Sequence, residues 1–218
     1  VYNRHLALNF PNDLKTGANA PDATILYRTL LAQEPDKSVV LLTTGSLVNI
    51  DRLLKSEPDG ISPLSGMELV KQKVKRLVSA GGRNPAGSSA NFRKPGAVPY
   101  TRYVIENWPT EYWFVGNEVG GDVITGRRLF TETPLRNPVR RAYELFQKHR
   151  PTATLRNSWD QLGVLVAVRG AGEYFFFQNT GMQTVNSEGY TRWVSSPDSE
   201  HAYAIRRTDK ATLKRIVD

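Results

Sequence analysis

One carboxylate in this sequence is placed where it could hold a cation. Asp160 follows Ser158 and Trp159 and begins an apolar segment with helical spacing. A carboxylate in the first turn of a helix most often interacts with the helix dipole, which contributes about 0.3–1 kcal/mol. The same carboxylate, pointing into a cleft, can bind a hard cation such as calcium, which takes carboxylate and backbone carbonyl oxygens. The residues alone leave both interpretations open, because a single Asp does not complete such a site.

Glycine-containing segments follow short apolar runs at 43–49, 81–92 and 116–121. In an open α/β sheet, ligands bind beyond the carboxyl ends of the strands, so these segments are the candidate binding loops. None of them is a Gly-x4-Gly-Lys-Ser/Thr phosphate loop, and no Gly-x-Gly-x-x-Gly follows a strand. Nucleotide-phosphate binding by either route is therefore not supported.

The positions of the histidines and the lack of cysteine further limit the catalytic and metal sites that this chain could form. His5, His149 and His201 have no metal-ligand spacing with one another, and no Ser/His/Asp order stands out. His149 is explained by the dipole of a predicted helix that it ends, and His5 lies in a predicted loop of the kind that closes over clefts. Without any Cys, a disulfide framework, a thiolate metal site and a Cys nucleophile are excluded.

The net charge of +8 over 218 residues raises the question of an anionic partner. Basic residues outnumber acidic ones by 14 to 9 in 1–109 and by 15 to 12 in 110–218, so the excess is spread along the chain. The densest cluster, at 71–76, falls on a predicted helix whose spacing scatters its cations around the axis. We interpret the charge as a solvated surface and do not favour nucleic acid as a partner. No apolar run approaches the ~20 residues that cross a bilayer, so we expect a soluble chain with no membrane or targeting segment.

Helices and short strands alternate along the chain, as in a right-handed α/β crossover fold. Residues 1–23 have an irregular pattern and are predicted as a surface segment. Strands are predicted at 39–42, 77–80 and 112–115. Helices are predicted from an Asp22 cap through Leu31, through 50–54, and at 65–75, 100–106, 138–148 and 159–168. The last part changes character, with antiparallel strands at 174–177, 183–185 and 192–194 and a helix at 210–217.

These elements predict an α/β fold with an open, mainly parallel Rossmann-like sheet, flanking helices and a small antiparallel C-terminal extension. Nothing in the pattern argues for a second domain, so 1–218 is taken as one.

Several short motifs resemble those of the inosine-uridine-preferring nucleoside hydrolase family. The segment 44–49, TGSLVN, resembles the family's TGPLTN turn, and 78–82, VSAGG, resembles its apolar strand ending in Met-Gly-Gly. Asn91-Phe92 falls where the family has Glu-aromatic-Asn. The segment 156–161 resembles a bacterial branch with an RxSWDQ motif, as do 107–109, NWP, and 116–120, GNEVG. The matches cover nearly all of 20–218 in the right order.

The resemblance implies calcium-dependent hydrolysis of the N-glycosidic bond of ribonucleosides, giving base and ribose, in purine or pyrimidine salvage. In that family the cation holds the ribose hydroxyls and the attacking water. Carried over to this sequence, Thr44 would supply a backbone carbonyl and Asp160 a carboxylate to calcium. Asn91 would hydrogen-bond the ribose. Trp159 stands where several members have a His acid, and its indole can stack on a base but cannot transfer a useful proton.

The sequence also departs from the family. Its Asp-rich DxDxxxDD motif, which supplies the general base and most calcium ligands, is nowhere in the chain, so no catalytic residue is identified and calcium binding by this chain is expected to be weak or absent. Together with the Val1 start, this predicts a domain that lacks its first strand, which would leave a strand edge unpaired.

Two functions therefore stay open. The chain is either a nucleoside hydrolase that turns over ribonucleosides, or an inactive homologue or fragment that binds a sugar, a nucleoside or a protein. Ser89, Ala90 and Pro95, where the family has polar, aromatic or acidic site residues, motivate the second. A homo-oligomer is compatible with both. Base preference and compartment are not assigned.

Overall fold

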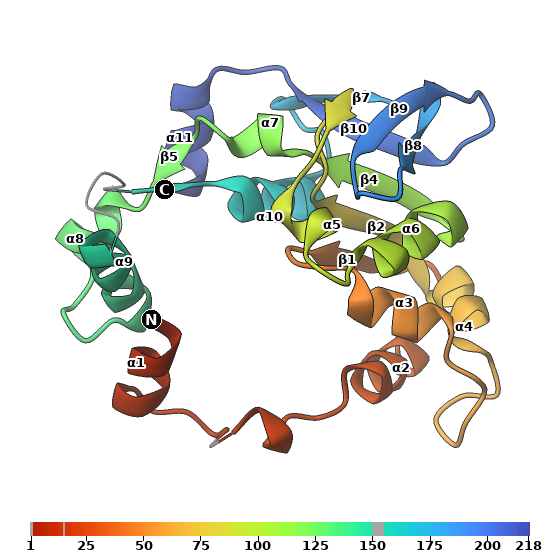
Figure 1. Ribbon diagram of the computed structural model, residues 1–218, viewed down its shortest axis with the longest axis horizontal. Coiled ribbons are helices and arrows are strands. Elements are labelled where there is room, and N and C mark those ends of the chain that lie inside the picture. The colour runs from red at the N-terminus through yellow and green to blue at the C-terminus, as the bar shows by residue number, and fades with distance from the viewer. Residues whose placement is uncertain (1, 15, 150–154) are drawn as a thin grey trace.

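Residues 2–14, 16–149 and 155–218 are described by the computed structural model of the chain. Within them, the central sheet has the strand order β1-β2-β4-β10-β7 (Figure 1). The first four strands run parallel, and β7 runs antiparallel to β10 at the edge. The strand bounds are β1 Val39–Thr43, β2 Val74–Ala80, β4 Glu111–Val115, β10 His201–Arg206 and β7 Phe175–Gln178. The predicted open, mainly parallel sheet is confirmed.

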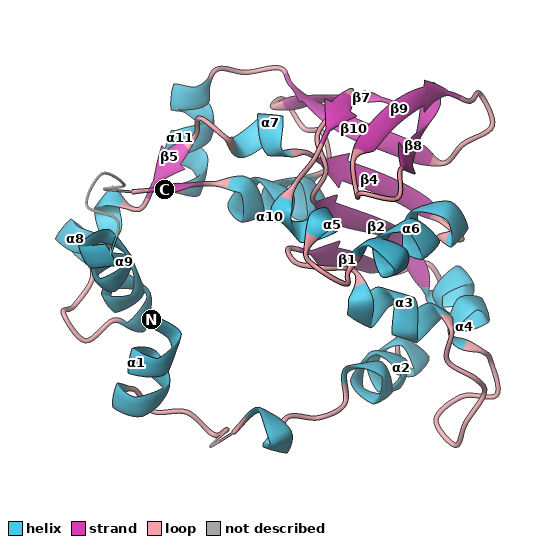
Figure 2. Ribbon diagram, in the orientation of Figure 1, coloured by secondary structure: helices cyan, strands magenta, loops and turns pink. Residues whose placement is uncertain are grey.

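Helices cover both faces of the central sheet (Figure 2). Leu77 of β2 packs in one hydrophobic core with residues of α2, α3, α4 and α6, and the next residue, Val78, packs in the other with residues of α7, α10 and α11. Successive side chains of a strand point to opposite faces, so one apolar run serves both cores. The helix bounds are α2 Ala23–Gln33, α3 Val48–Leu54, α4 Gly66–Lys73, α6 Val98–Asn107, α7 Asn117–Gly120, α10 Trp159–Arg169 and α11 Lys210–Val217.

A buried chain of hydroxyl groups crosses the three strands β1, β2 and β4. The Oγ1 atom of Thr43 lies 2.7 Å from Oγ of Ser79, which lies 3.0 Å from Oη of Tyr112. All three residues are buried, and burial raises the pKa of Tyr112 far above its usual range. A shift of one residue in any strand would turn its hydroxyl to the other face and leave its partners unsatisfied. The hydroxyl chain therefore specifies the register of these strands.

A smaller antiparallel sheet contains β3 (Ala86–Gly87), β9 (Thr191–Ser195) and β8 (Gly181–Val185), in that order. Two of the predicted C-terminal strands lie here, whereas the one predicted at 174–177 edges the central sheet as β7. His201 is the first residue of β10, a strand that is not among those predicted from the sequence. Its Nδ1 atom accepts a hydrogen bond from the Gln183 backbone N–H at 3.2 Å, so it joins the two sheets.

The N-terminal segment differs from the prediction of an irregular loop. Tyr2–Asn9 forms helix α1, which packs against α9 (Pro138–His149), and Figure 1 shows both beside α8 (Arg127–Glu132), away from the central sheet. His5 therefore lies on a helix, where its Nε2 atom accepts a hydrogen bond from Arg141 at 3.3 Å. The helix was missed because its partner lies some 130 residues away in the sequence. The side chain of His149 falls outside the described part of the chain.

The basic cluster at 71–76 is also arranged differently from the prediction. Helix α4 ends at Lys73 and β2 begins at Val74, so Lys75 and Arg76 lie on a strand. Lys73 pairs with Asp36, and Arg76 pairs with the strand neighbour Glu111. These pairs neutralise part of the cluster, in agreement with a solvated surface. Across the described residues, no helix is long and apolar enough to span a membrane.

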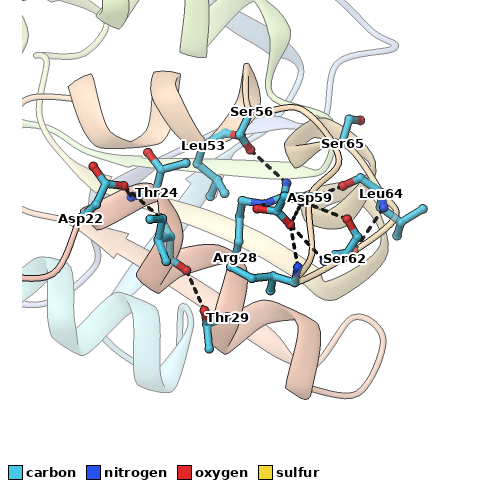
Figure 3. A network of polar contacts seen from close by, with 12 residues as sticks. Asp22, Thr24, Arg28, Thr29, Leu53, Ser56, Asp59, Ser62, Leu64 and Ser65 are labelled. Atoms are coloured by element: carbon cyan, nitrogen blue, oxygen red, sulfur yellow. Dashed lines mark hydrogen bonds and ion pairs between the residues drawn. The ribbon is translucent and has the colours of Figure 1, made fainter.

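A buried arginine connects α2 to the loop between α3 and α4 (Figure 3). Arg28 is 1% exposed, and its Nε and Nη2 atoms each donate to one carboxylate oxygen of Asp59 at 2.8 Å. Its Nη1 atom donates to Oγ of Ser56 at 3.0 Å, and Nη2 also donates to the carbonyls of Ser62 and Leu64 at 3.2 and 3.0 Å. The planar guanidinium therefore binds the Asp59 carboxylate, the Ser56 hydroxyl and two backbone carbonyls at once.

We expect Arg28→Ala to lower the free energy of unfolding. The Leu64 carbonyl loses its Arg28 donor, at a cost of about 1–3 kcal/mol, whereas the Ser62 carbonyl still accepts from the Asp59 backbone N–H. Arg28→Lys should restore only part of the loss because an ammonium lacks the fork. Urea denaturation measures the loss, with exposed Arg102→Ala as control. Arg28 also holds the pKa of Asp59 at about 2, below its ordinary 3.8, so this stabilisation should be present above about pH 4 and fade as pH falls toward 2. Equal midpoints for Arg28→Ala and the parent protein would contradict the role assigned to Arg28.

A second prediction concerns His201, whose burial lowers its pKa from 6.5 to about 4. On acidification, His201 is protonated at a higher pH in the unfolded chain than in the folded protein. The free energy of unfolding should therefore keep its full value above about pH 6.5 and should fall by roughly 3 kcal/mol as the pH drops to 4. His201→Gln should flatten this dependence, since Gln does not titrate. Denaturation midpoints measured across that range test it, and an unchanged slope in the variant would show that another group is responsible.

Candidate functional site

The carboxyl ends of the parallel strands gather at one edge of the central sheet. Thr44 directly follows β1, Gly81 and Gly82 follow β2, and Gly116 follows β4. Helix α10 crosses this edge on one face: a Cβ at Gly163 would lie 3.2 Å from that of Ala80 and 3.4 Å from Leu42. The first turn of α10 lies against α7, because a Cβ at Gly120 would come within 2.9 Å of the Trp159 backbone, so the helix begins beside the loop that follows β4. The three predicted binding loops and the start of α10 therefore share one edge.

Thr44 is exposed at the end of β1, one residue past the buried Thr43 that takes part in the hydroxyl chain. The fully buried Leu47 then anchors the loop before α3 begins. The carbonyl of Thr44 thus lies on a backbone segment held at both ends. This is the kind of fixed backbone oxygen that a hard cation accepts as a ligand.

Trp159 and Asp160 are the first two residues of α10, and their side chains have different surroundings. The indole Nε1–H of Trp159 donates to the carbonyl of Asn117 at 3.1 Å, which attaches the ring to α7 at the end of β4. The Asp160 carboxyl is exposed, and partial burial raises its pKa, an effect that Arg156 opposes. Its pKa is not lowered, so no neighbouring cation dominates its surroundings among the described residues. Both interpretations of Asp160, as a helix-terminal charge and as a cation ligand, are compatible with this position.

Asn91 lies on the short helix α5 (Ala90–Arg93) and supports the loop after β2. Its Nδ2 atom donates to the carbonyl of Ala80 at 2.8 Å, which leaves Oδ1 as the free end of the amide. Ser89 makes a parallel contact, since its Oγ accepts from the N–H of Gly82 at 2.7 Å. A Cβ at Gly81 would lie 2.5 Å from the Phe92 ring, so this turn requires glycine. Asn91, for which the family resemblance implies a contact with ribose, thus also has a structural use.

The four predicted residues, Thr44, Asn91, Trp159 and Asp160, thus lie on three elements at one edge of the sheet. No hydrogen bond or ion pair connects any two of them in the described ranges. The same ranges hold no group of three or more His, Cys, Asp or Glu side chains placed to bind a metal. Since calcium takes about six to eight oxygen ligands, Thr44 and Asp160 do not make a tight site by themselves.

Sequence reasoning missed two residues at the same edge, Asn84 and Glu118. The Glu118 Oε2 atom accepts a hydrogen bond from the Asn84 backbone N–H at 3.1 Å. Its Oε1 atom and both polar side-chain atoms of Asn84 are buried and make no hydrogen bond of standard geometry among the described residues, although the Asn84 amide lies close enough to the Glu118 carboxyl to favour its charged form. Burial raises the pKa of Glu118, while backbone N–H groups, Arg83 and the nearby Asn84 amide partly offset this. The available signal was position: Glu118 comes two residues after the glycine that ends β4, and Asn84 two after Gly82.

No protein-family model matches the sequence, and no curated protein matches it significantly. The fold is similar to that of a purine-preferring ribonucleoside hydrolase from Gardnerella vaginalis, with a TM-score of 0.63 and 17% identity over 91% of this chain and 65% of that one. It is also similar to an inosine-uridine-preferring nucleoside hydrolase from Bacillus anthracis, with a TM-score of 0.58 and 19% identity over 91% of this chain and 66% of that one. This chain therefore spans just under two thirds of the length of these structures. At such identities the likeness establishes a shared fold.

We expect Glu118→Gln to change how stability depends on pH. A carboxyl whose pKa is raised in the folded protein keeps its proton there longer than in the unfolded chain, so stability falls as pH rises past the ordinary pKa of 4.5. The amide does not ionise, so the variant should gain stability relative to the parent protein between about pH 4 and pH 7. Denaturation midpoints at both pH values measure this, with exposed Glu173→Gln as the matched control. If the difference in denaturation midpoint between parent and variant is the same at pH 4 and at pH 7, this would argue against a desolvated Glu118.

Proposed function

We propose that the chain binds ribonucleosides at the carboxyl edge of its central sheet and hydrolyses their N-glycosidic bond to base and ribose. One observation carries the proposal. Thr44, Asn91, Trp159 and Asp160, which a family resemblance selected from sequence, all lie at that edge in a chain whose fold is similar to those of two nucleoside hydrolases. Such an activity would serve purine or pyrimidine salvage.

The surroundings of these residues are compatible with the parts that the proposal gives them. The Trp159 indole is attached to Asn117 through its N–H and is not fully buried, so its ring can stack on a nucleobase. It cannot protonate the leaving base, because an indole N–H is not a useful acid. Asn91 can offer Oδ1 to a ribose hydroxyl while its Nδ2 atom continues to hold Ala80. Cleavage of the glycosidic bond develops oxocarbenium character, which carboxylates near the sugar stabilise.

Calcium belongs to the proposal as a weakly held cation. The carbonyl of Thr44 and the carboxylate of Asp160 would contribute two oxygens, and calcium would position the ribose hydroxyls and a water when bound. Two protein ligands are few, so we expect weak binding by this chain. We assign no residue as the general base.

Binding without turnover is the second candidate function, and contacts after β2 favour it. Asn91 Nδ2 and Ser89 Oγ both hold the backbone of that loop, and Ala90 is exposed there without any polar group. The family resemblance puts a substrate-binding Glu at the position of Ser89 and an aromatic residue at that of Ala90. A scaffold that uses these positions to support a loop can bind a ligand without the groups that cleave it.

Incubation of the chain with inosine or uridine in the presence of calcium tests both functions. Hydrolysis releases free base, detected by chromatography, and Asp160→Ala should lower the rate about 10- to 100-fold, as expected for the loss of one charged interaction. Exposed Asp198→Ala is the matched control, and Trp159→Phe should retain base stacking. Calorimetric binding of nucleoside without base release would favour the second function. Neither binding nor release at millimolar nucleoside would overturn both.

A further inference from the structure

The outer edge of β1 is an unpaired strand edge among the described residues. β1 stands first in the strand order of the central sheet and pairs there with β2 alone, so it borders the sheet (Figure 1). Residues 40–43 follow β2 in unbroken register. Every second residue of such a strand directs its backbone N–H and C=O away from its neighbour. These groups are available to pair with another strand.

The side chains of β1 are apolar on both faces and are incompletely covered. Leu41 packs against the core that α2, α3, α4 and α6 share, and Leu42 packs against the core on the α10 face. Neither is fully buried, and Val40 is 36% exposed, whereas Leu77 and Val78 of the neighbouring β2 are 0% exposed. A strand added beside β1 would therefore remove apolar surface from water on both faces of the sheet.

β1 also lacks the devices that protect natural sheet edges, which are usually charged residues or Pro. In the central sheet, each of the interior strands β2, β4 and β10 carries a charged residue, whereas the edge strands β1, VVLLT, and β7, FFFQ, carry none. At β7 the Arg207 guanidinium lies 5.2 Å from the ring centre of the exposed Phe176. A cation thus lies beside β7, which leaves β1 as the edge better suited to pairing.

The strand that fits this edge must be uncharged and apolar on both faces, and β1 itself has such a sequence. Two copies related by a two-fold axis can pair their β1 strands antiparallel, which closes the assembly as a dimer. When the pairing is centred on Leu41, Val40 lies opposite Leu42 of the second copy, and both point to the α10 face. Lys37 then lies opposite the uncharged segment 44–46, so like charges do not meet.

We infer that β1 is a dimerisation edge, at which the β1 strands of two copies pair antiparallel and join their central sheets into one continuous sheet. The two candidate nucleoside sites then lie at opposite margins of the joined sheet, because the parallel strands of the two copies run in opposite directions. The inference does not depend on nucleoside hydrolysis, since it is measured as the mass of the assembly. Its failure and that of the proposed function are therefore distinguishable.

Sedimentation equilibrium of the full chain measures the association. We expect twice the mass of one chain to be populated at about 100 μM protein. Val40→Lys should weaken dimerisation at least tenfold, because it places an ammonium in an apolar contact beside a sheet edge. Phe176→Lys is the matched control, since Phe176 is an exposed apolar residue of the other edge strand, and it should leave dimerisation unchanged. Circular dichroism spectra check that both variants keep the fold.

Cross-linking locates the contact without adding a charge. The chain has no Cys, so Val40→Cys introduces a single thiol. In the inferred pairing the two thiols lie on one face, two residues along and one strand apart, or about 8 Å between Cα atoms. A short bismaleimide should therefore link two copies of Val40→Cys and should not link copies of Phe176→Cys. A monomer at about 100 μM, a dimer unaffected by Val40→Lys, or linkage through position 176 in place of position 40 would overturn the inference.

Discussion

The register of the parallel strands is the constraint on which the candidate sites depend. The hydroxyl chain through Thr43, Ser79 and Tyr112 is buried across β1, β2 and β4, where an unpaired hydroxyl is costly. It lies near the carboxyl ends of β1 and β2, so it determines where each of these strands stops and its loop begins. A slip of one residue in β1 would move Thr44 relative to Gly81 by a residue length and would turn the Thr44 side chain to the other face. The chemistry at the sheet edge thus rests on hydroxyl contacts that touch no ligand.

Local signals in the sequence predicted the elements that they dominate. Asp22 accepts hydrogen bonds from the first N–H groups of α2 as expected of a cap, and the helix predicted at 210–217 has the bounds of α11. The predictions that failed depend on distant partners. Helix α1 rests on α9, and the assignment of β7 to the central sheet depends on pairing with β10. Periodicity within a window carries no information on such pairings.

The same division applies to the sites. Thr44 and Asp160 could be singled out because each follows or begins an element, which is a local property. Asn84 and Glu118 could not, because their significance lies in their burial, and that burial is created by β10 and α7 closing over them. From the sequence alone, a Glu after a glycine turn is predicted to be an ordinary surface residue. Its burial becomes apparent only when the position of β10 is known. Residues 44 and 160 could thus be selected from the sequence, whereas the buried contact between Glu118 and Asn84 is apparent only in the folded chain.

The position of β10 has a consequence for how the chain folds. It pairs with β4, about 90 residues earlier, on one side and with the edge strand β7 on the other, so the sheet is completed only by the strand at 201–206. During synthesis, β1, β2 and β4 leave the ribosome with one edge of β4 still unpaired. Pairings of such sequence separation form slowly, and exposed strand edges meanwhile favour association between chains. The strand order therefore leaves this edge of β4 open until the last part of the chain has been made.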